Sequence, residues 1–170
     1  MSTCGCAPKE RGGQTWERAA LIKARPVAGD IAVGEEFLRI VTPFVYRKYL
    51  DFTSIEEIKE MKDRINLAAA RARKTGRDLK LGAGGIREIE FFAQAHQLIY
   101  GGKTHALRVR GTMEALSVLA RLDIVTGKEF ADLAEAYRFL RMLEHRIQVF
   151  QERQTHVLPQ REEDFSRLAR

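Results

Sequence analysis

Residues 128–153, KEFADLAEAYRFLRMLEHRIQVFQER, carry the longest helical pattern in the chain. One seam of side chains recurs at alternating steps of three and four, which is typical of helices packed in bundles and coiled coils. Its members are Phe130, Leu133, Tyr137, Leu140, Glu144, Ile147 and Gln151. The stretch therefore predicts one long helix that packs along this seam, with the carboxylate of Glu144 on the packing face.

Helical patterns fill most of the remaining sequence. We expect a helix from Thr15 to Pro26, one from Asp30 to about Leu50, one from Thr53 or Ser54 to Gly76, one from the glycine motif to Tyr100, and one from Thr112. No convincing strand alternation and no internal repeat is present. The sequence predicts an all-α fold: a helical bundle of about six to seven helices with one long central helix.

Capping residues, prolines and glycines near the helix ends support these bounds. Asp30 is a suitable N-cap residue, and Pro43 should kink or split the helix that follows it. Gly101 and Gly102 are expected to close the helix that ends at Tyr100. Beyond Pro159, residues 161–170, REEDFSRLAR, predict the start of one more helix that runs out at Arg170.

Composition places the chain among soluble globular proteins. It has 170 residues, of which 45% are hydrophobic and 31% charged. No apolar run approaches the ~20 residues of a membrane span, and no secretory signal is visible, so a cytoplasmic location without membrane contact is expected. Residues 1–12 predict an unstructured leader that contains the C-x-C pair Cys4 and Cys6, and residues 13–170 predict a single helical domain.

The net charge is +6, which suggests acidic partners such as nucleotides or phosphate. Lysine and arginine are spread along the chain and mixed with 23 acids, so solvated helix faces account for most of them. Nucleic-acid binding has no RNA or DNA motif behind it. The four histidines show no ligand spacing, and no catalytic triad or metal site is evident.

The glycine motif KLGAGGIREIEF, residues 80–91, has two interpretations. It lacks the spacing of a P-loop or of a dinucleotide fingerprint, so it can simply be a glycine turn that opens a helix. Glycines that lead into a helix also leave backbone N–H groups at its positive dipole end, which suits an anion. Arg87 can add a two-pronged contact to a phosphate or carboxylate.

The two glutamates of the motif are separated by helix geometry. If the helix has begun by Arg87, Glu88 falls on the apolar stripe of Phe91 and its successors, and Glu90 falls on the opposite side. A carboxylate on a packing face needs a partner, so Glu88 should meet a base or a metal, or point into a cavity. Were the segment a strand instead, both glutamates would share one face as a metal pair.

Other polar positions also have two interpretations. Glu88 and Glu144 can form structural salt bridges inside the bundle, or they can border a polar active-site cleft. Lys23 and Arg25, just before Pro26, either compensate a helix dipole or contact phosphate. Trp16 is expected in the core or as an interface anchor.

Three stretches together resemble one enzyme family: GQTWERAALIKARPVAGD from Gly13 to Asp30, the glycine motif from Lys80 to Phe91, and EAYRFLRMLEHRIQVFQERQTHVLP from Glu135 to Pro159. The family is bacterial glutamine synthetase adenylyltransferase/deadenylylase, and the resemblance is to its N-terminal half. It runs from about Gly13 to the last residue, with the three motifs in the family's order.

The resemblance implies a bifunctional enzyme with two nucleotidyltransferase modules. One module adds AMP from ATP to a tyrosine of glutamine synthetase. The N-terminal module removes it by phosphorolysis, releasing ADP, under control of the PII signalling protein. In such modules a mixed α/β core carries a D-x-D signature that holds Mg²⁺, and a helical domain follows the core.

This chain departs from the family at the D-x-D signature, which its sequence does not contain. We therefore expect a fragment: the helical domain that follows the deadenylylase core, truncated at its C-terminal end and not catalytic alone. The rival hypotheses are a non-enzymatic docking module for glutamine synthetase or PII, and a degenerate truncated product. The missing nucleotidyltransferase core is itself an expected partner.

The resemblance and the chemistry together nominate a site. The candidate residues for nucleotide and phosphate are Lys23, Arg25, Lys80, Gly82, Gly84, Gly85 and Arg87, and the supporting polar cluster is Glu88, Glu90 and Glu144. The Gly84 and Gly85 amides and Arg87 are expected to approach phosphate, while Glu88 orders a basic partner or a metal-bound water. No residue of this chain is expected to be catalytic.

Overall fold

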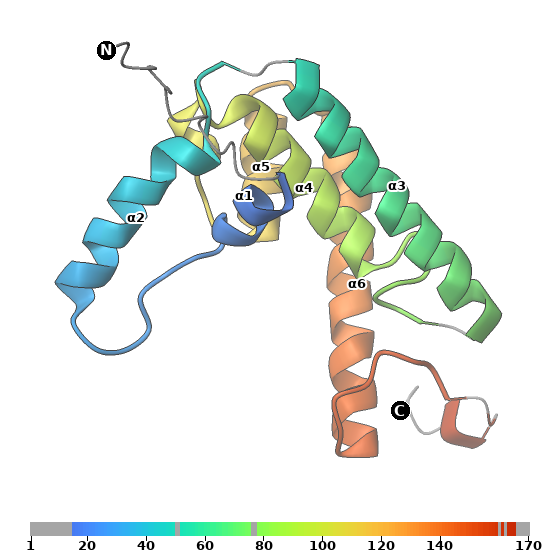
Figure 1. Cartoon of the computed structure of the whole chain (residues 1–170). Helices are drawn as coiled ribbons and strands as arrows, with labels where there is room; N and C mark the ends of the chain where they lie inside the picture. The colour runs from blue at the N-terminus through green and yellow to red at the C-terminus, as the bar shows by residue number, and fades with distance from the viewer. Residues whose placement is uncertain (1–14, 50–51, 76–77, 160, 162, 166–170) are drawn as a thin grey trace, which may run out of the picture.

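The computed structural model describes residues 15–49, 52–75, 78–159, 161 and 163–165. The elements are α1 Thr15–Leu21, α2 Ile31–Val45, α3 Phe52–Thr75, α4 Ile86–Tyr100, the 3₁₀ helix η1 His105–Leu107, α5 Thr112–Arg121 and α6 Gly127–Gln151. Within these ranges there is no strand, only an isolated antiparallel bridge between Asp78 and Val157. The all-α prediction is confirmed (Figure 1).

Most predicted helix bounds are close to the observed ones, and the exceptions are the ends of α1 and α2. Instead of continuing to Pro26, α1 ends at Leu21, because tight turns from Ile22 to Ala19 and from Ala24 to Leu21 replace helical bonding. Pro43 lies inside α2, which ends two residues later at Val45 rather than near Leu50. The predictions for residues 1–12 and for the end of the third helix at Gly76 lie outside the described residues, as does most of the predicted last helix.

Side-chain caps define the starts of α2 and α6. Asp30 caps α2 as predicted, because its carboxylate accepts from the backbone N–H groups of Ala32 and Val33. Thr126 begins α6 with a capping box in which its hydroxyl oxygen accepts from Glu129 N while the Glu129 carboxylate accepts from Thr126 N. The Thr126 backbone N–H and, to a smaller extent, the Thr126 hydroxyl donate to the Glu129 carboxylate and lower the pKa of Glu129.

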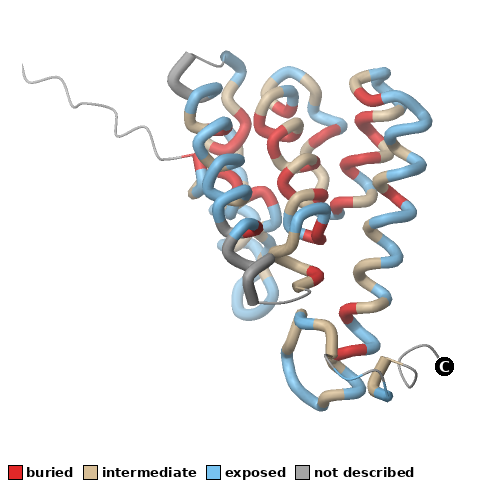
Figure 2. Tube along the Cα trace, turned by 90° about the vertical axis from the view of Figure 1, so that its right-hand side faces the viewer, coloured by how far each residue is buried: buried red, intermediate tan, exposed pale blue. Residues whose placement is uncertain are grey.

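The central helix is α4, which contacts α1 and α3 on one side and α5 and α6 on the other (Figure 1). The longest helix is α6, as predicted, but α4 occupies the position between the others. Figure 2 shows buried residues where helices face one another and exposed residues along the outer turns. Because α4 is enclosed from two directions, its buried residues are not confined to a single stripe.

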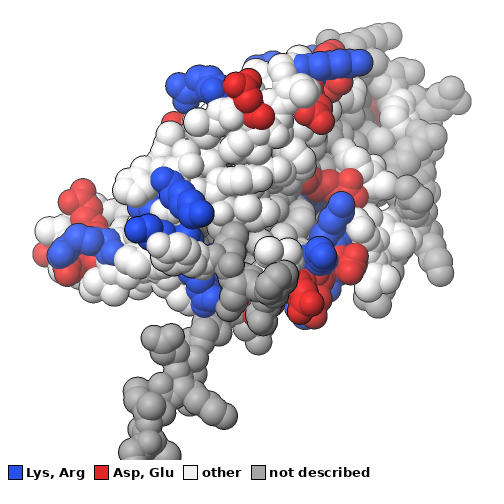
Figure 3. Space-filling view, turned by 90° about the horizontal axis from the view of Figure 1, so that it is seen from above, with Lys and Arg blue, Asp and Glu red and all other residues white. Residues whose placement is uncertain are grey.

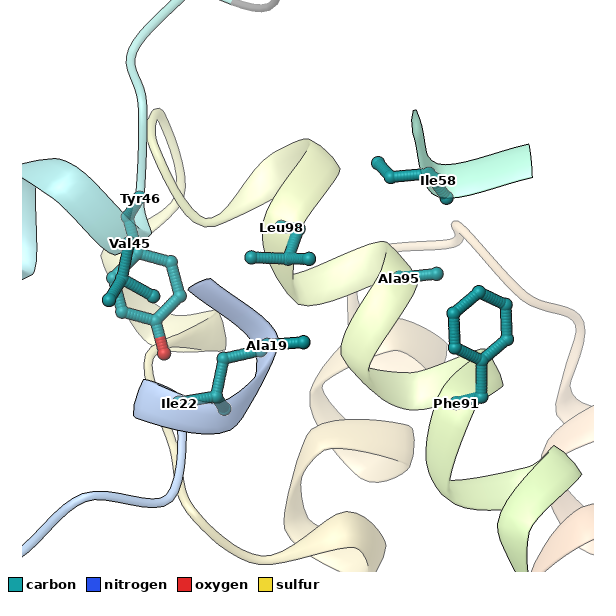
Figure 4. Close-up of a cluster of buried hydrophobic side chains, with 8 residues drawn as sticks. All are labelled: Ala19, Ile22, Val45, Tyr46, Ile58, Phe91, Ala95 and Leu98. Atoms are coloured by element: carbon teal, nitrogen blue, oxygen red, sulfur yellow. The ribbon is translucent and has the colours of Figure 1, made fainter. Parts of the chain in front are cut away.

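One hydrophobic core lies between α1, the end of α2, α3 and α4 (Figure 4). Ala19 and Ile22 come from α1 and the turn after it, and Ile58 comes from α3. The remaining buried members are Val45, Tyr46, Phe91, Ala95 and Leu98. This cluster holds the short α1 against α4 through Phe91, Ala95 and Leu98.

A second core lies on the opposite side of α4, where Ile89 and Ala93 meet α5, η1 and α6. Its fully buried side chains are Leu107, Ala115, Leu116 and Leu119. Burial of each leucine contributes ~1.5–3 kcal/mol relative to exposure. The predicted seam of α6 contributes the flanking residues Phe130, Leu133, Tyr137 and Leu140, which confirms its orientation toward other helices.

No helix in the described part of the chain is long and apolar enough to cross a membrane.

Candidate functional site

A cleft of ≈ 700 Å³ lies beside the glycine motif, between α1, α3 and the first half of α4. Its lining residues are Trp16, Ala19, Ala20, Lys23, Met61, Arg64, Ile65, Lys80, Leu81, Arg87, Glu90, Phe91 and Gln94. Three of the cations nominated from the sequence, Lys23, Lys80 and Arg87, therefore line one cleft although they come from separate segments. Glu90 lines it as well.

The cleft combines positive charge with an apolar wall. Among the described residues, four cationic side chains and one carboxylate, that of Glu90, line it. Trp16, whose exposed fraction is 53%, lies at the surface rather than in the core. Figure 3 shows acids and bases close together on the face it presents, with wide areas that carry neither.

Asp78 shapes the loop that carries Lys80 into the cleft. Its Oδ1 accepts from the backbone N–H groups of both Lys80 and Leu81 at 2.8 Å, and its carbonyl oxygen accepts from Gly82 N at 2.9 Å. The segment after α6 fixes the start of this loop, because Leu79 N donates to the carbonyl oxygen of His156 at 2.8 Å. The loop is therefore held by interactions on both sides of Lys80.

The glycines of the motif are required by the path of the backbone. Gly84 has φ +72°, a conformation that favours glycine, and a Cβ at Gly85 would lie 2.7 Å from the carbonyl oxygens of Gly82 and Leu79. The amides already have protein acceptors: Gly84 N donates to Glu88 Oε2 at 3.0 Å, and Gly85 N donates to Gly82 O at 2.9 Å. Side-chain cations, rather than these amides, face the cleft.

Glu90 lies opposite the apolar stripe of Phe91, as helix geometry predicts, but this second side of α4 also packs against other segments. Its Oε1 accepts from Lys23 Nζ at 3.3 Å and from the hydroxyl of Tyr137 in α6 at 3.2 Å. Lys23 Nζ also donates to Thr112 Oγ1 at 3.4 Å. The physical reason is the central position of α4, which leaves no solvent face opposite its first apolar stripe.

Tyr137 remains a hydrogen-bond donor in this arrangement. Burial raises the pKa of Tyr137 from its ordinary value of 10.0, opposed in part by a hydrogen bond with Thr112, and the charge of Glu90 raises it further. The hydroxyl is therefore protonated at neutral pH and donates to the Glu90 carboxylate, so that α6 orients the one acid of the cleft.

Glu88 and Glu144 lie elsewhere. Glu88 is half-buried and caps the glycine turn through Gly84 N. Glu144 is 2% exposed; its Oε2 accepts from Arg141 Nη1 at 2.5 Å, and its Oε1 lies 2.8 Å from His156 Nδ1. That histidine nitrogen contacts the carboxylate without the alignment of a hydrogen bond. Glu144 thus follows the salt-bridge alternative and holds the segment after α6.

Two further sequence interpretations can be placed. Arg25 is exposed and is not among the residues that line the cleft. The strand alternative for residues 86–91 is wrong, because α4 begins at Ile86. The Mg²⁺ that the family resemblance implies does not fit the described residues, among which no cluster of three or more histidine, cysteine, aspartate or glutamate side chains forms a metal site.

Sequence reasoning missed Arg64, Asp78, Thr112 and Tyr137 as parts of the site. Arg64 comes from α3 and lines the cleft between Met61 and Ile65 of the same helix. No local sequence signal separates Arg64 from the other arginines of α3. Thr112 and Tyr137 act through hydrogen bonds between segments distant in sequence, and Asp78 acts within its own turn; helical periodicity reveals neither.

Fold and site define the class: an all-α domain with a basic cleft built around a glycine turn. A sequence model of the family described as GlnD PII-uridylyltransferase matches residues 55–170. The chain therefore belongs to this family.

Curated relatives extend the match to nearly the whole chain. The chain is 52% identical over 162 residues to the bifunctional glutamine synthetase adenylyltransferase/adenylyl-removing enzyme of Agrobacterium fabrum, and 51% identical to that of Rhizobium meliloti. The enzyme of the same name from Stenotrophomonas maltophilia is 51% identical over 160 residues. These matches cover 94% of this chain but only 16–17% of each relative, so the chain spans about a sixth of their length.

Proposed function

We propose that this chain is the helical part of a nucleotidyltransferase that adenylylates and deadenylylates glutamine synthetase. The relatives named above support this substrate, because their names describe both activities. PII enters the proposal as the regulatory partner that the family resemblance implies. In the proposed enzyme, ATP or ADP and Mg²⁺ are used at a catalytic core, and residues 13–170 form one helical domain beside it.

The observation that carries the proposal is the convergence of Lys23, Arg64, Lys80 and Arg87 on one cleft. Lysine and arginine form charge-assisted hydrogen bonds with phosphate oxygens, and these are about twice as strong as neutral ones. A nucleotide also presents a planar base, which the apolar wall and Trp16 can contact. The proposed role of the cleft is to bind the phosphate groups of the nucleotide.

The residues present indicate which steps of the proposed reaction this chain can contribute. The sequence contains no D-x-D pair, and the cleft has a single carboxylate. Metal-assisted transfer of the AMP group is therefore assigned to carboxylates outside this chain, and the cleft is assigned binding and orientation. Orientation of this kind places reacting groups without requiring any covalent step by the helical domain.

We expect Arg87→Ala to weaken ATP binding by about tenfold, since loss of one charge-assisted contact costs ~1.5 kcal/mol. Arg87 is exposed and its backbone N–H bonds to Lys80 O, so the side chain can be removed without loss of that loop contact. Calorimetric titration of the 170-residue chain with ATP, ADP and inorganic phosphate measures the effect.

Lys128→Ala is the matched control, because Lys128 is an exposed cation in the first turn of α6, away from the cleft lining. It should bind ATP as the unmodified chain does. An equal loss of ATP affinity in both variants would mean that the effect comes from net charge and not from a contact of Arg87. The absence of ATP binding by the folded chain would contradict a nucleotide site in this domain.

A docking function is the second candidate, and α2 is the observation that favours it. This helix extends away from the bundle (Figure 1), and Ile31, Val33, Phe37 and Ile40 on it are each about half exposed or more. Exposed apolar patches often mark protein contacts. Binding of purified glutamine synthetase by a chain that binds no ATP would favour this alternative.

A further inference from the structure

Glu90 connects four parts of the structure at the edge of the cleft. It belongs to α4, it accepts from Lys23 after α1 and from Tyr137 of α6, and Lys23 in turn donates to Thr112 at the start of α5. Glu90 and Lys23 line the cleft, whereas Tyr137 does not. The Glu90 carboxylate therefore pairs with Lys23, a cation that an incoming anion would also contact.

The ion pair is built so that an anion can compete with it. Lys23 Nζ and Glu90 Oε1 are 3.3 Å apart, with side-chain exposures of 40% and 25%. Partly exposed pairs of this kind are worth only ~0.2–1 kcal/mol. A phosphate group that recruits Lys23 together with Lys80 and Arg87 can displace Glu90 from the lysine, but it must then lie near an uncompensated carboxylate.

Tyr137 keeps Glu90 at this position when Lys23 is withdrawn. Its hydroxyl donates to the same Oε1 at 3.2 Å, and α6 is anchored by the second core. The carboxylate cannot simply turn away from an arriving anion without losing this bond. Repulsion by Glu90 is thus part of the cleft in both its empty and its occupied state.

We propose that Glu90 is an affinity-limiting residue of the cleft, a built-in competitor that holds Lys23 in the empty state and weakens the binding of phosphate-bearing ligands. This inference rests on the proposed function, because it concerns the same cleft. Its role is to oppose binding, and the expected benefit is faster release of nucleotide from a site with four cations.

The test is calorimetric titration of the full 170-residue chain with ATP and, separately, inorganic phosphate. Glu90→Gln removes the charge but keeps an oxygen that can accept from Tyr137, and we expect it to bind ATP about two- to fivefold more tightly. Tyr137→Phe retains the Glu90 charge but frees the carboxylate to turn away, so it should tighten ATP binding less than Glu90→Gln does. Urea denaturation of each variant verifies that it is folded.

A double-mutant cycle separates competition for Lys23 from general repulsion. In a Lys23→Met background, Glu90→Gln should improve ATP affinity less than it does in the unmodified chain. An equal improvement in both backgrounds would show repulsion without competition and would overturn the competitor role.

The remaining outcomes separate this inference from the proposed function. Unchanged or weaker binding by Glu90→Gln, while the unmodified chain binds ATP, would overturn the inference and leave the nucleotide site intact. Binding only after Glu90→Gln would support the inference and show that the cleft is masked in the isolated chain. Absence of binding by both would overturn both proposals.

Discussion

Replacement of Gly102 by alanine is expected to destabilise the fold by about 3 kcal/mol or more, at the upper end of the range for overpacking. A Cβ at this position would lie 1.9 Å from the carbonyl oxygen of Arg47 and 2.5 Å from its carbonyl carbon. Both are backbone atoms, so no side-chain rotation relieves the clash. Urea denaturation of the unmodified and variant chains measures the loss.

Gly127→Ala is the control for this result. A Cβ at Gly127 meets nothing within 4 Å, and the residue is the first of α6. Alanine there should leave stability unchanged or raise it by up to about 1 kcal/mol, because it restricts the unfolded chain. Equal stability of the two variants would contradict the close approach of the backbone at residues 47–48 to Gly102, just after α4.

Arg18→Ala is expected to cost about 2–5 kcal/mol, the second large effect. Arg18 is 1% exposed, and its Nε and Nη2 donate to the carbonyl oxygen of Val45 at 3.2 and 3.1 Å. Because Val45 is the last residue of α2, this contact fixes α2 to α1. Denaturation gives the size of the loss, and amide hydrogen exchange should show it first in α2.

Two companion variants separate the contributions of Arg18. Arg18→Met retains an apolar stem of similar length and loses the donors, so it should cost less than alanine. Arg39→Ala removes an arginine whose side chain is 75% exposed and pairs with Glu36 of the same helix, and it should change stability by less than about 0.5 kcal/mol. Equal effects of Arg18→Ala and Arg39→Ala would contradict the buried role of Arg18.

Local signals were sufficient for most helix bounds. Asp30, Gly101 and Thr112 mark the ends at which α2, α4 and α5 begin or finish, and the seam of α6 faces other helices as its periodicity predicts. These features depend on residues within one or two turns of each other. The end of α1 depends instead on the tight turns at Ile22 and Ala24, so a prediction that took Pro26 as the stop extended the helix too far.

The candidate site was predictable only in part. Lys23, Lys80 and Arg87 were nominated because each lies near a helix end or a glycine turn, and they line one cleft. Arg64 was missed because nothing local distinguishes it from other arginines on α3. The contacts of Glu90 were missed because a single apolar stripe was assumed for α4, which contacts four other helices.

The central claim is that the basic cleft binds nucleotide phosphates, and the most direct measurement is a set of ¹H–¹⁵N correlation spectra of the labelled chain titrated with ATP. The account predicts the largest shifts at residues 80–91, at Lys23 and at the indole N–H of Trp16, the only tryptophan. Shifts confined to the smaller depression of ≈ 380 Å³ near Lys48 and Lys103, or no shifts at all, would contradict it.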